Sequence, residues 1–425
     1  MESYATALNI AIPAFMGLIL LEMLAGRMMG RTTFRVMDTV SSLSSGITNI
    51  TKDVLGLALF IGAYAWLQPK IEVFDLKATW ATYLLAFVGK DFAGYWIHRF
   101  EHRVNYFWNR HLIHHSSEEF NLPCALRQSI SEIVSYSFVF LLPIAILGVP
   151  VEVYAVIAPI HLFAQFWYHT TLIGRMGPLE HILVTPSHHR VHHAINPEYI
   201  DKNFSQIFII WDKLFGTFQE EMDDVPPVYG IKRAVRTWNP ILINFQHAWL
   251  VIRDFWRTKS WRDKARIWFM PTGWRPADVA ERYPVEITDD PYTQEKYDPP
   301  ASTALKIWAG VQLASVLVMA IYLFNRLPDI PYTASLGFGG LLFLSVFAYT
   351  SLMDRTTWAW IADVVRAGIV LGIVMATGDF FLLGQIWPAG PIVVAAFFVG
   401  SALASLGFTL FEFRGDRDTL NVKKA

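Results

Sequence analysis

The sequence predicts an all-α, multi-pass transmembrane protein with a histidine-rich helical cap on the cytoplasmic side of the membrane. Composition indicates the membrane: 53% of the 425 residues are hydrophobic and only 17% are charged, which is too apolar for an ordinary soluble domain. Apolar stretches near the length of a membrane span recur along the chain. Most of the 13 histidines stand in short groups close to the ends of these stretches.

About nine stretches are apolar enough to be membrane spans, since a helix needs about 20 mostly apolar residues to cross a bilayer. They are 7–24, 53–68, 78–97, 129–148, 151–169, 303–324, 333–353, 358–378 and 387–411. The chain divides into two expected domains. Residues 1–302 hold every histidine, and residues 303–425 are a bundle of about four spans without any.

Basic residues predict the orientation. The N-terminus has no Lys or Arg before the first span, which is typical of a retained anchor with an external N-terminus rather than a signal peptide. The positive-inside rule places three basic regions in the cytoplasm. They are the loop with Arg27, Arg31, Arg35 and Lys52, the stretch 231–266, and the tail with Arg414, Arg417, Lys423 and Lys424. An odd number of spans satisfies all three and places every histidine group on the cytoplasmic face of a bacterial inner membrane or an endoplasmic reticulum.

Two classes of protein are excluded by charge and cysteine content. The net charge of −1 provides no basic field for nucleic acid. The chain has a single cysteine, Cys124, so it cannot form an intrachain disulfide. The near absence of cysteine also excludes thiolate zinc sites and iron–sulfur clusters.

Nine histidines have the spacing of metal ligands. They are His98, His102, His111, His114, His115, His169, His189, His192 and His193. On a helix, residues at i, i+3 and i+4 share a face, so each H-x-x-H-H triplet is expected to aim three imidazoles at one point. Imidazole suits iron, zinc, copper or nickel. A structural zinc needs four ligands and a catalytic zinc three, so nine histidines favour two redox metals and the oxidation of a lipid C–H bond.

Other polar residues are candidates for supporting roles. Asp91 lies two helical turns before His98 and is expected to accept a hydrogen bond from a ligand imidazole. Asp212 is expected either to accept a hydrogen bond behind a ligand or to end a helix or strand, and His188 to face the substrate or stand behind the ligands. A metal transporter is the non-enzyme alternative, but transporters place ionisable ligands near the middle of their spans, whereas these histidines lie beyond span ends.

The motifs resemble the membrane fatty acid hydroxylase and sterol desaturase superfamily. Within it, DFAGYWIHR, HHSSEEFNLPCALRQS, QFWYHT, TPSHHRVHH and IDKNFSQIFIIWDKLFGTF resemble the alkylglycerol monooxygenase branch over about residues 85–220. The resemblance implies two irons per chain bound by the nine histidines, O2 as oxidant, and a membrane lipid as substrate. It further implies hydroxylation of the carbon next to the ether oxygen of an alkylglycerol. The hemiacetal that forms then breaks into an aldehyde and a glycerol derivative.

The resemblance also implies tetrahydrobiopterin as the source of electrons. Arg127 and Gln128 then become candidates to bind the pterin or a lipid headgroup, the alternative being a helix cap and an interface anchor. The first motif departs from the branch, because Arg103 rather than an acidic residue follows His102, and Glu101 precedes it. A hydroxylase or desaturase of a sterol, fatty acyl or other polar lipid, with a ferredoxin or cytochrome as electron donor, therefore stays open.

Overall fold

The computed structural model describes residues 2–56, 60–131 and 137–413, and in these ranges the ordered elements are helices. Two isolated β-bridges, Leu183–Phe208 and Ala194–Tyr229, are the extended pairings in the same ranges. The long helices are α1 Glu2–Met28, α2 Val36–Val54, α4 Trp80–Arg103, α10 Pro240–Arg257, α13 Thr303–Arg326, α14 Tyr332–Met353, α15 Ala359–Thr377 and α17 Gly390–Gly407. The short ones are α3 Phe60–Ile71, α5 Asn105–His115, α6 Ser137–Ile146, α7 Val151–Phe163, α8 Pro186–His193, α9 Ile210–Phe215, α11 Trp261–Arg266, α12 Ala277–Arg282 and α16 Leu383–Ile386.

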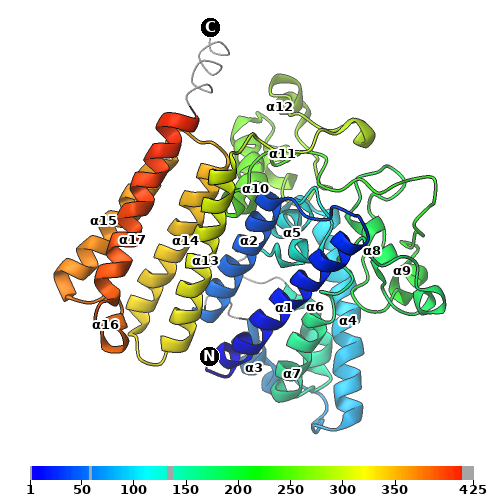
Figure 1. Ribbon diagram of the computed structural model, residues 1–425. Helices are drawn as coiled ribbons and strands as arrows, with labels where there is room; N and C mark the ends of the chain where they lie inside the picture. The colour runs from blue at the N-terminus through cyan, green and yellow to red at the C-terminus, as the bar shows by residue number, and fades with distance from the viewer. Residues whose placement is uncertain (1, 57–59, 132–136, 414–425) are drawn as a thin grey trace.

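Five helices in the described residues are long and apolar enough to cross a membrane. They comprise part of α1, then α13, α14, α15, and α17 with the turn that follows it to Glu412. The last four stand side by side as one bundle, at the left of Figure 1. These helices indicate a membrane protein, as composition predicted, but the nine predicted spans are not confirmed.

The other four predicted spans take different forms. The stretch 78–97 lies within α4, which is long but carries Lys90 and Asp91. The hairpin predicted at 129–169 forms α6 and α7, of 10 and 13 residues. At 1.5 Å per residue these helices measure only about 15 and 20 Å, less than the roughly 30 Å of a bilayer core. The stretch 53–68 is divided between the end of α2 and α3. Residues 57–59 and 132–136, within these stretches, lie outside the described residues, as does the basic tail from Arg414.

Local sequence explains where the positioning helices begin. Thr79 caps α4 by accepting a hydrogen bond from the backbone N–H of Thr82. Asn239 caps α10 with Pro240 in its first turn, and Ser302 caps α13 through the N–H of Leu305. Such caps satisfy backbone donors that the first turn of a helix leaves free. Helix α4 carries two of the grouped histidines and α10 lines the cavity described below, so the points where these helices begin determine where those side chains lie.

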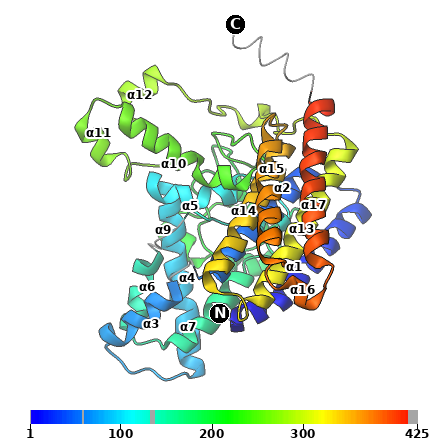
Figure 2. The ribbon, with the colours of Figure 1, turned by 90° about the vertical axis from the view of Figure 1, so that its left-hand side faces the viewer.

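Two hydrophobic cores lie on either side of the histidines. One joins α2 to α13, α14, α15 and α17, and the other joins α4 to α3, α6 and α7. Figure 2 shows the first group on the right, the second at the lower left, and α10 to α12 extending from the upper left. Asp354, at the end of α14, ties the bundle to the histidine-bearing part, because it accepts hydrogen bonds from the Trp238 N–H at 2.7 Å and the Tyr297 hydroxyl at 3.0 Å.

Candidate metal centre

All nine predicted ligand histidines lie together, in two groups. His98 and His102 come from the end of α4, the triplet 111, 114 and 115 from α5, His169 from the segment after α7, and the triplet 189, 192 and 193 from α8. The first group is His98, His102, His111, His115 and His192; the second is His114, His169, His189 and His193. Within each group the candidate ligand atoms all lie within 4.8 Å of one another.

Each H-x-x-H-H triplet is divided between the groups, which corrects the expectation that its three imidazoles meet at one point. In α5 the i, i+4 pair His111 and His115 joins the first group while His114 joins the second. In α8 the i, i+4 pair joins the second group and His192 joins the first. A helix turns about 100° per residue, so i and i+4 point nearly the same way while i+3 diverges. Helices α5 and α8 therefore each contribute histidines to both groups, so the two groups form one centre.

The Nε2 atoms of the first group face one another at short range. The distance from His98 to His111 is 2.8 Å, from His111 to His115 is 3.0 Å, and from His115 to His192 is 3.1 Å. Two nitrogens bound to one metal at about 2.1 Å and at right angles lie about 3.0 Å apart. The spacing of these atoms therefore fits neighbouring ligands of one ion.

The second group repeats this geometry. The Nε2 of His169 lies 3.3 Å from that of His114 and 2.9 Å from that of His189, and the Nε2 of His193 lies 3.0 Å from that of His189. Phe120 and Tyr168 pack their rings against the same imidazoles, with centroids 5.8 Å from His169 and 4.3 Å from His189 respectively. These aromatic side chains enclose the second group on one side.

Backbone carbonyls determine which nitrogen faces the centre. The Nδ1–H of His98 donates to the Phe204 carbonyl at 2.7 Å, and that of His192 to the Lys202 carbonyl at 3.0 Å. His114 likewise donates to the carbonyl of Arg127 at 3.3 Å. A neutral imidazole has one N–H, so each Nε2 presents a lone pair to the other lone pairs. The Nε2 of His102 is buried without a hydrogen-bond partner as well. Convergent lone pairs repel one another unless a cation lies between them, so the donor set fits metal ions.

Burial favours the form of histidine that binds metals. Desolvation lowers the pKa of every imidazole that α5 and α8 contribute to the groups, to about 4 for His114. The neighbouring imidazoles lower the pKa further for most of them. At neutral pH these side chains are therefore neutral, which is the protonation state a metal ligand requires.

Asp212 supports the first group through the loop before α9. Its carboxylate accepts hydrogen bonds from the N–H groups of Phe204 at 2.8 Å and Ser205 at 2.7 Å, and from the Thr217 hydroxyl at 2.6 Å. The carbonyl of Phe204 is the acceptor for His98. Gly94 lets this loop approach α4, because a Cβ there would lie 2.1 Å from Gln206 Oε1. Asp212 therefore positions a ligand through one intervening peptide.

Asp91 has partners other than those predicted. Its buried carboxylate accepts hydrogen bonds from His161 Nε2 at 2.9 Å, from the N–H groups of Ile207 and Phe208, and from the Trp211 indole at 2.8 Å. None of these donors belongs to the two histidine groups. The expectation of a hydrogen bond to a ligand imidazole is therefore wrong, because His161 of α7, Trp211 of α9 and the loop before α9 supply the donors to this carboxylate. Asp91 fastens α4, α7 and that loop together.

Arg127 and Gln128 are engaged within the protein. The guanidinium of Arg127 is 2% exposed and donates to Ser42, Ser116 and the carboxylate of Asp38, at 2.8 to 2.9 Å. Gln128 donates its side-chain N–H to the Ala125 carbonyl at 3.0 Å. Arg127 thus uses three of its five N–H donors within the protein and is buried away from the cavity, and its contribution to the centre is its carbonyl, which accepts from His114.

His188 lies apart from the centre. It lines a small polar cavity of about 100 Å³ with Arg175, Glu180 and Glu221, and its ring contacts Phe218. The next residue, His189, belongs to the second group, so consecutive side chains of α8 point away from each other. His188 therefore does not face the cavity that adjoins the metal centre.

Sequence reasoning missed several groups that hold the ligands. Glu101 lies 3.4 Å from His111 Nδ1 and also pairs with Arg110. The carbonyls of Phe204 and Lys202 orient two ligands, but every residue carries a carbonyl, so no sequence signal marks them. Glu101 stands ten residues before His111, across the corner between α4 and α5, so helical spacing does not predict their contact.

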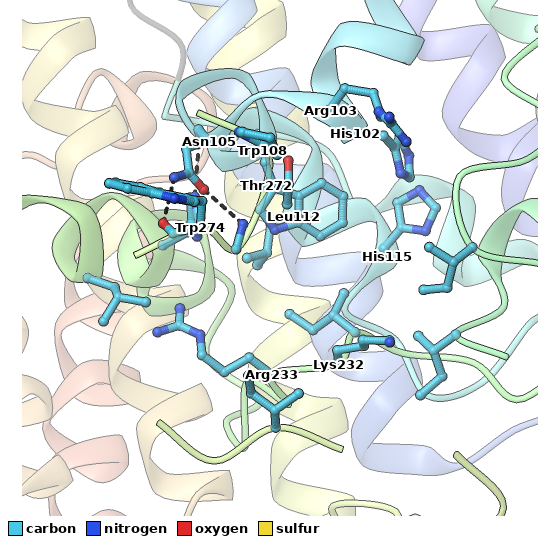
Figure 3. A pocket seen from close by; sticks show the side chains of 18 of the residues that line it. His102, Arg103, Asn105, Trp108, Leu112, His115, Lys232, Arg233, Thr272 and Trp274 are labelled. Carbon is cyan, nitrogen blue, oxygen red and sulfur yellow. Dashed lines mark hydrogen bonds between the residues drawn. The ribbon is translucent and has the colours of Figure 1, made fainter. Parts of the chain in front are cut away.

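A cavity of about 470 Å³ adjoins the centre. Figure 3 shows His102 and His115 on one side of it and Trp274 and Arg233 on the other. Apolar side chains from α5, α10 and the loops before and after α10 make up most of its wall, including Leu112, Leu250, Val251, Ile231 and Ile267. Asn105 holds that loop in place by donating to the carbonyls of Ile267 and Trp274, both at 3.0 Å.

Charged residues of this cavity are partly paired. Arg103, whose position breaks the expected pattern, donates to Asp201 at 2.6 Å, and Arg275 forms two hydrogen bonds with Asp254. Both acidic residues of the wall are thus neutralised. Lys232 and Arg233 also line the cavity and belong to none of its ion pairs. The cavity therefore combines apolar walls with a cationic edge, next to the ligands of the first group.

Comparison with known proteins identifies the family. The fatty acid hydroxylase family model matches residues 83–217, which include all nine histidines. Alkylglycerol monooxygenase of Homo sapiens is 34% identical over 390 residues, covering 91% of this chain and 85% of that protein. The enzyme of the same name from Danio rerio is 36% identical over 322 residues, covering 74% and 70%. An ornithine lipid hydroxylase from Rhizobium tropici is 30% identical over 135 residues, covering 32% and 41%.

No solved structure matches the chain. The similarity to the vertebrate enzymes extends over most of both chains, far beyond the histidine motifs. The chain therefore belongs to the alkylglycerol monooxygenase family, a group of lipid monooxygenases that share the fatty acid hydroxylase domain.

Proposed function

We propose that this lipid monooxygenase holds two irons in the two histidine groups and hydroxylates the ether-adjacent carbon of an alkylglycerol. The observation that carries the proposal is the convergence of nine imidazoles, in sets of five and four, with the Nε2 lone pairs of His98, His114 and His192 turned inward. Iron bound by such nitrogens supplies the O2 activation that oxidation of an unreactive C–H bond requires.

The reaction balances with two electrons and two protons. One oxygen atom of O2 enters the C–H bond next to the ether oxygen, the other leaves as water, and the hemiacetal that results breaks into a fatty aldehyde and a glycerol derivative. The relatives' name supports the alkylglycerol as substrate. The apolar wall of the 470 Å³ cavity suits an alkyl chain, while Lys232 and Arg233 suit the oxygen-rich end of the molecule.

The protein's own groups position the ligands and shape the cavity. Carbonyls of Phe204, Lys202 and Arg127 hold three imidazoles in one tautomer, and Asp212 holds the loop that presents the first of these carbonyls. Ligand imidazoles oriented in this way are more basic and rigid, which strengthens their hold on a metal. His102, His115 and His192 of the first group border the cavity, whereas His193 is the one member of the second group that does, so the first group presents more of its ligands to the substrate.

Tetrahydrobiopterin is the proposed electron source, on the strength of the family relationship. Arg127 is committed to Asp38, so a pterin would instead occupy the cavity beside Trp108 and Trp274, whose ring faces and edges suit a flat heterocycle. The alternative is an electron-donor protein such as a ferredoxin or cytochrome. An ornithine lipid hydroxylase is similar to 32% of this chain, so a different polar lipid is the alternative substrate.

We propose residues 1–302 as the oxygenase domain and residues 303–425 as a separate bundle of about four spans, with the metal centre on the cytoplasmic face. Five candidate spans form an odd number, as nine do. With the N-terminus outside, the segment between α1 and α13 then lies in the cytoplasm, which agrees with its basic stretches. A bacterial inner membrane and an endoplasmic reticulum both satisfy this arrangement.

Two measurements on purified protein test the proposal. Metal analysis is expected to find about two irons per chain, and copper or a single zinc would contradict it. An alkylglycerol supplied with O2 and tetrahydrobiopterin is expected to yield a fatty aldehyde. If product forms only with a ferredoxin system, the pterin assignment is wrong; if other polar lipids react and alkylglycerols do not, the substrate assignment is wrong.

A further inference from the structure

Helix α10 has two apolar faces, and the described part of the chain covers only one of them. Ile243, Leu250 and Val251 lie on the buried face, and the last two line the cavity beside the metal centre. The other face carries a row of large apolar side chains in the open. They are Leu242, Phe245, Trp249 and Trp256, which are 41%, 47%, 58% and 74% exposed. Their spacing of 3, 4 and 7 residues places them on one side of the helix.

The exposed row continues past the end of α10. Trp261 in α11 is 81% exposed, and Phe269 in the following turn is 71% exposed. This turn is fixed at the corner between α4 and α5, because the N–H groups of Asn105 and Tyr106 donate to the carbonyls of Met270 and Trp268, at 3.0 and 2.9 Å. We refer to residues 240–270 as the α10–α11 segment.

The corner between α4 and α5 lies beside apolar helices. The ring of Phe100, near the end of α4, lies 5.5 Å from that of Phe140 in α6, a helix in which the described side chains are largely apolar. Phe100 is itself 37% exposed and Tyr106 is 51% exposed. The open aromatic surface of the α10–α11 segment is thus continuous with that of the corner where the apolar part of the protein ends. Aromatic side chains in this position are typical of the boundary between lipid and water.

The charge of the segment is strongly positive. Residues 253–266 contain six Lys and Arg against two Asp, a net charge of +4 in a chain whose total is −1. Both acidic residues are engaged, Asp254 with Arg275 and Asp263 with Arg266. Lys259 and Arg262 are exposed beside Trp261. A protein partner would favour an apolar centre depleted of lysine, whereas interleaved tryptophan and cations match the headgroups of anionic lipids.

We propose that the α10–α11 segment is a membrane-surface anchor that inserts its aromatic row among the headgroups of anionic phospholipids. The segment then has lipid on one face and the cavity on the other, so it brings the wall of the cavity to the lipid surface. This contact is additional to the candidate spans and does not depend on bound iron.

Site-specific fluorescence in nanodiscs tests the anchor directly. The chain contains one cysteine, Cys124, which is 1% exposed and whose thiol pKa is raised by burial, so a thiol-reactive dye will label an introduced cysteine instead. The test variants are Phe245→Cys and Trp256→Cys, and Glu281→Cys on the exposed side of α12 is the matched control. The dye is an environment-sensitive nitrobenzoxadiazole, with nitroxide-bearing lipids and aqueous iodide as the two quenchers.

We expect lipid nitroxide to quench the 245 and 256 labels at least about twofold more than the 281 label, and iodide to show the reverse order. We expect lipid nitroxide to quench the 256 label more strongly in nanodiscs of phosphatidylglycerol than in nanodiscs of phosphatidylcholine. The double substitution Lys259→Glu with Arg262→Glu is expected to abolish this difference. Labels at 245 and 256 that iodide reaches as freely as the control would overturn the proposal. Labels protected from both quenchers would overturn it as well, since a protein would then cover the face. Neither readout uses enzymatic activity, so the outcome is independent of the proposed reaction.

Discussion

Two of the buried polar clusters in the described residues differ in how their charges and lone pairs are balanced. In the metal centre, acceptor faces acceptor: His98, His114 and His192 each donate through Nδ1 to a backbone carbonyl, so their Nε2 lone pairs point into the two groups. In the C-terminal bundle, donor meets acceptor. Arg366 forms an ion pair with Asp363 and donates to Gln312 at 2.9 Å, while Gln312 donates to Ser401 at 3.0 Å.

This contrast separates a site that needs a ligand from one that stabilises the fold. Buried charges are tolerated when they are paired, so the charges of Asp363 and Arg366 balance each other without an outside ligand, although Nε and Nη1 of Arg366 are buried without hydrogen-bond partners among the residues that the structure describes. The histidine groups have no such complement within the described chain and require cations from outside. The cluster in the bundle therefore fastens α13, α15 and α17 to one another, and the histidine centre is the proposed site of the chemistry.

The largest effect is expected from removing a ligand. His114→Ala takes one imidazole from the second group and His192→Ala takes one from the first, so each should lower both the iron content and the rate, the rate by roughly three orders of magnitude or more. Metal analysis and aldehyde formation measure the two effects. His181→Gln, on an exposed histidine outside the groups, is the matched control. Full activity in either ligand variant would contradict the assignment of both groups.

The bundle is expected to respond in stability rather than in iron content. Asp363→Asn leaves the Arg366 guanidinium buried without a counter-charge, which should cost about 3–5 kcal/mol of unfolding free energy. Thermal unfolding in detergent measures the loss, and iron per folded chain should stay unchanged. Replacing both residues with apolar ones of similar volume, Asp363→Leu with Arg366→Met, should restore most of the stability. Loss of iron without loss of stability would show that the two clusters are not separate in function.

A smaller effect is expected from the support behind the ligands. Asp212→Asn removes one of the two carboxylate acceptors that hold the Phe204 and Ser205 N–H groups, so the carbonyl that orients His98 becomes less rigid. Iron affinity should fall about 10- to 100-fold, as is usual when such a supporting group is lost. Competition with a chelator measures the affinity. Asp201→Asn, which alters only the pair with exposed Arg103, should leave it unchanged. Equal losses of iron affinity in both variants would contradict a specific role of Asp212 in positioning His98.

Much of the site could be predicted because its signal is local. The residues of an H-x-x-H-H motif are close neighbours on one helix, and imidazole has a narrow range of chemical uses in such numbers, so the nine histidines that the structure brings together could be picked out as candidate ligands for oxidative chemistry. Composition was likewise sufficient to indicate a helical membrane protein. The number of spans could not be inferred, since apolarity marks α6 and α7 as strongly as a true span although both helices are short.

The sequence by itself identified the nine histidines that are proposed to bind metal and indicated a helical membrane protein. Only the tertiary structure decided how the nine imidazoles divide into five and four, because helical spacing says which residues share a face but not which face of another helix they meet. It also decided that Arg127 pairs with Asp38, that Asp91 pairs with His161, and that carbonyls from residues 127, 202 and 204 orient the ligands. These contacts join segments that are distant in the chain, and backbone acceptors look the same at every position.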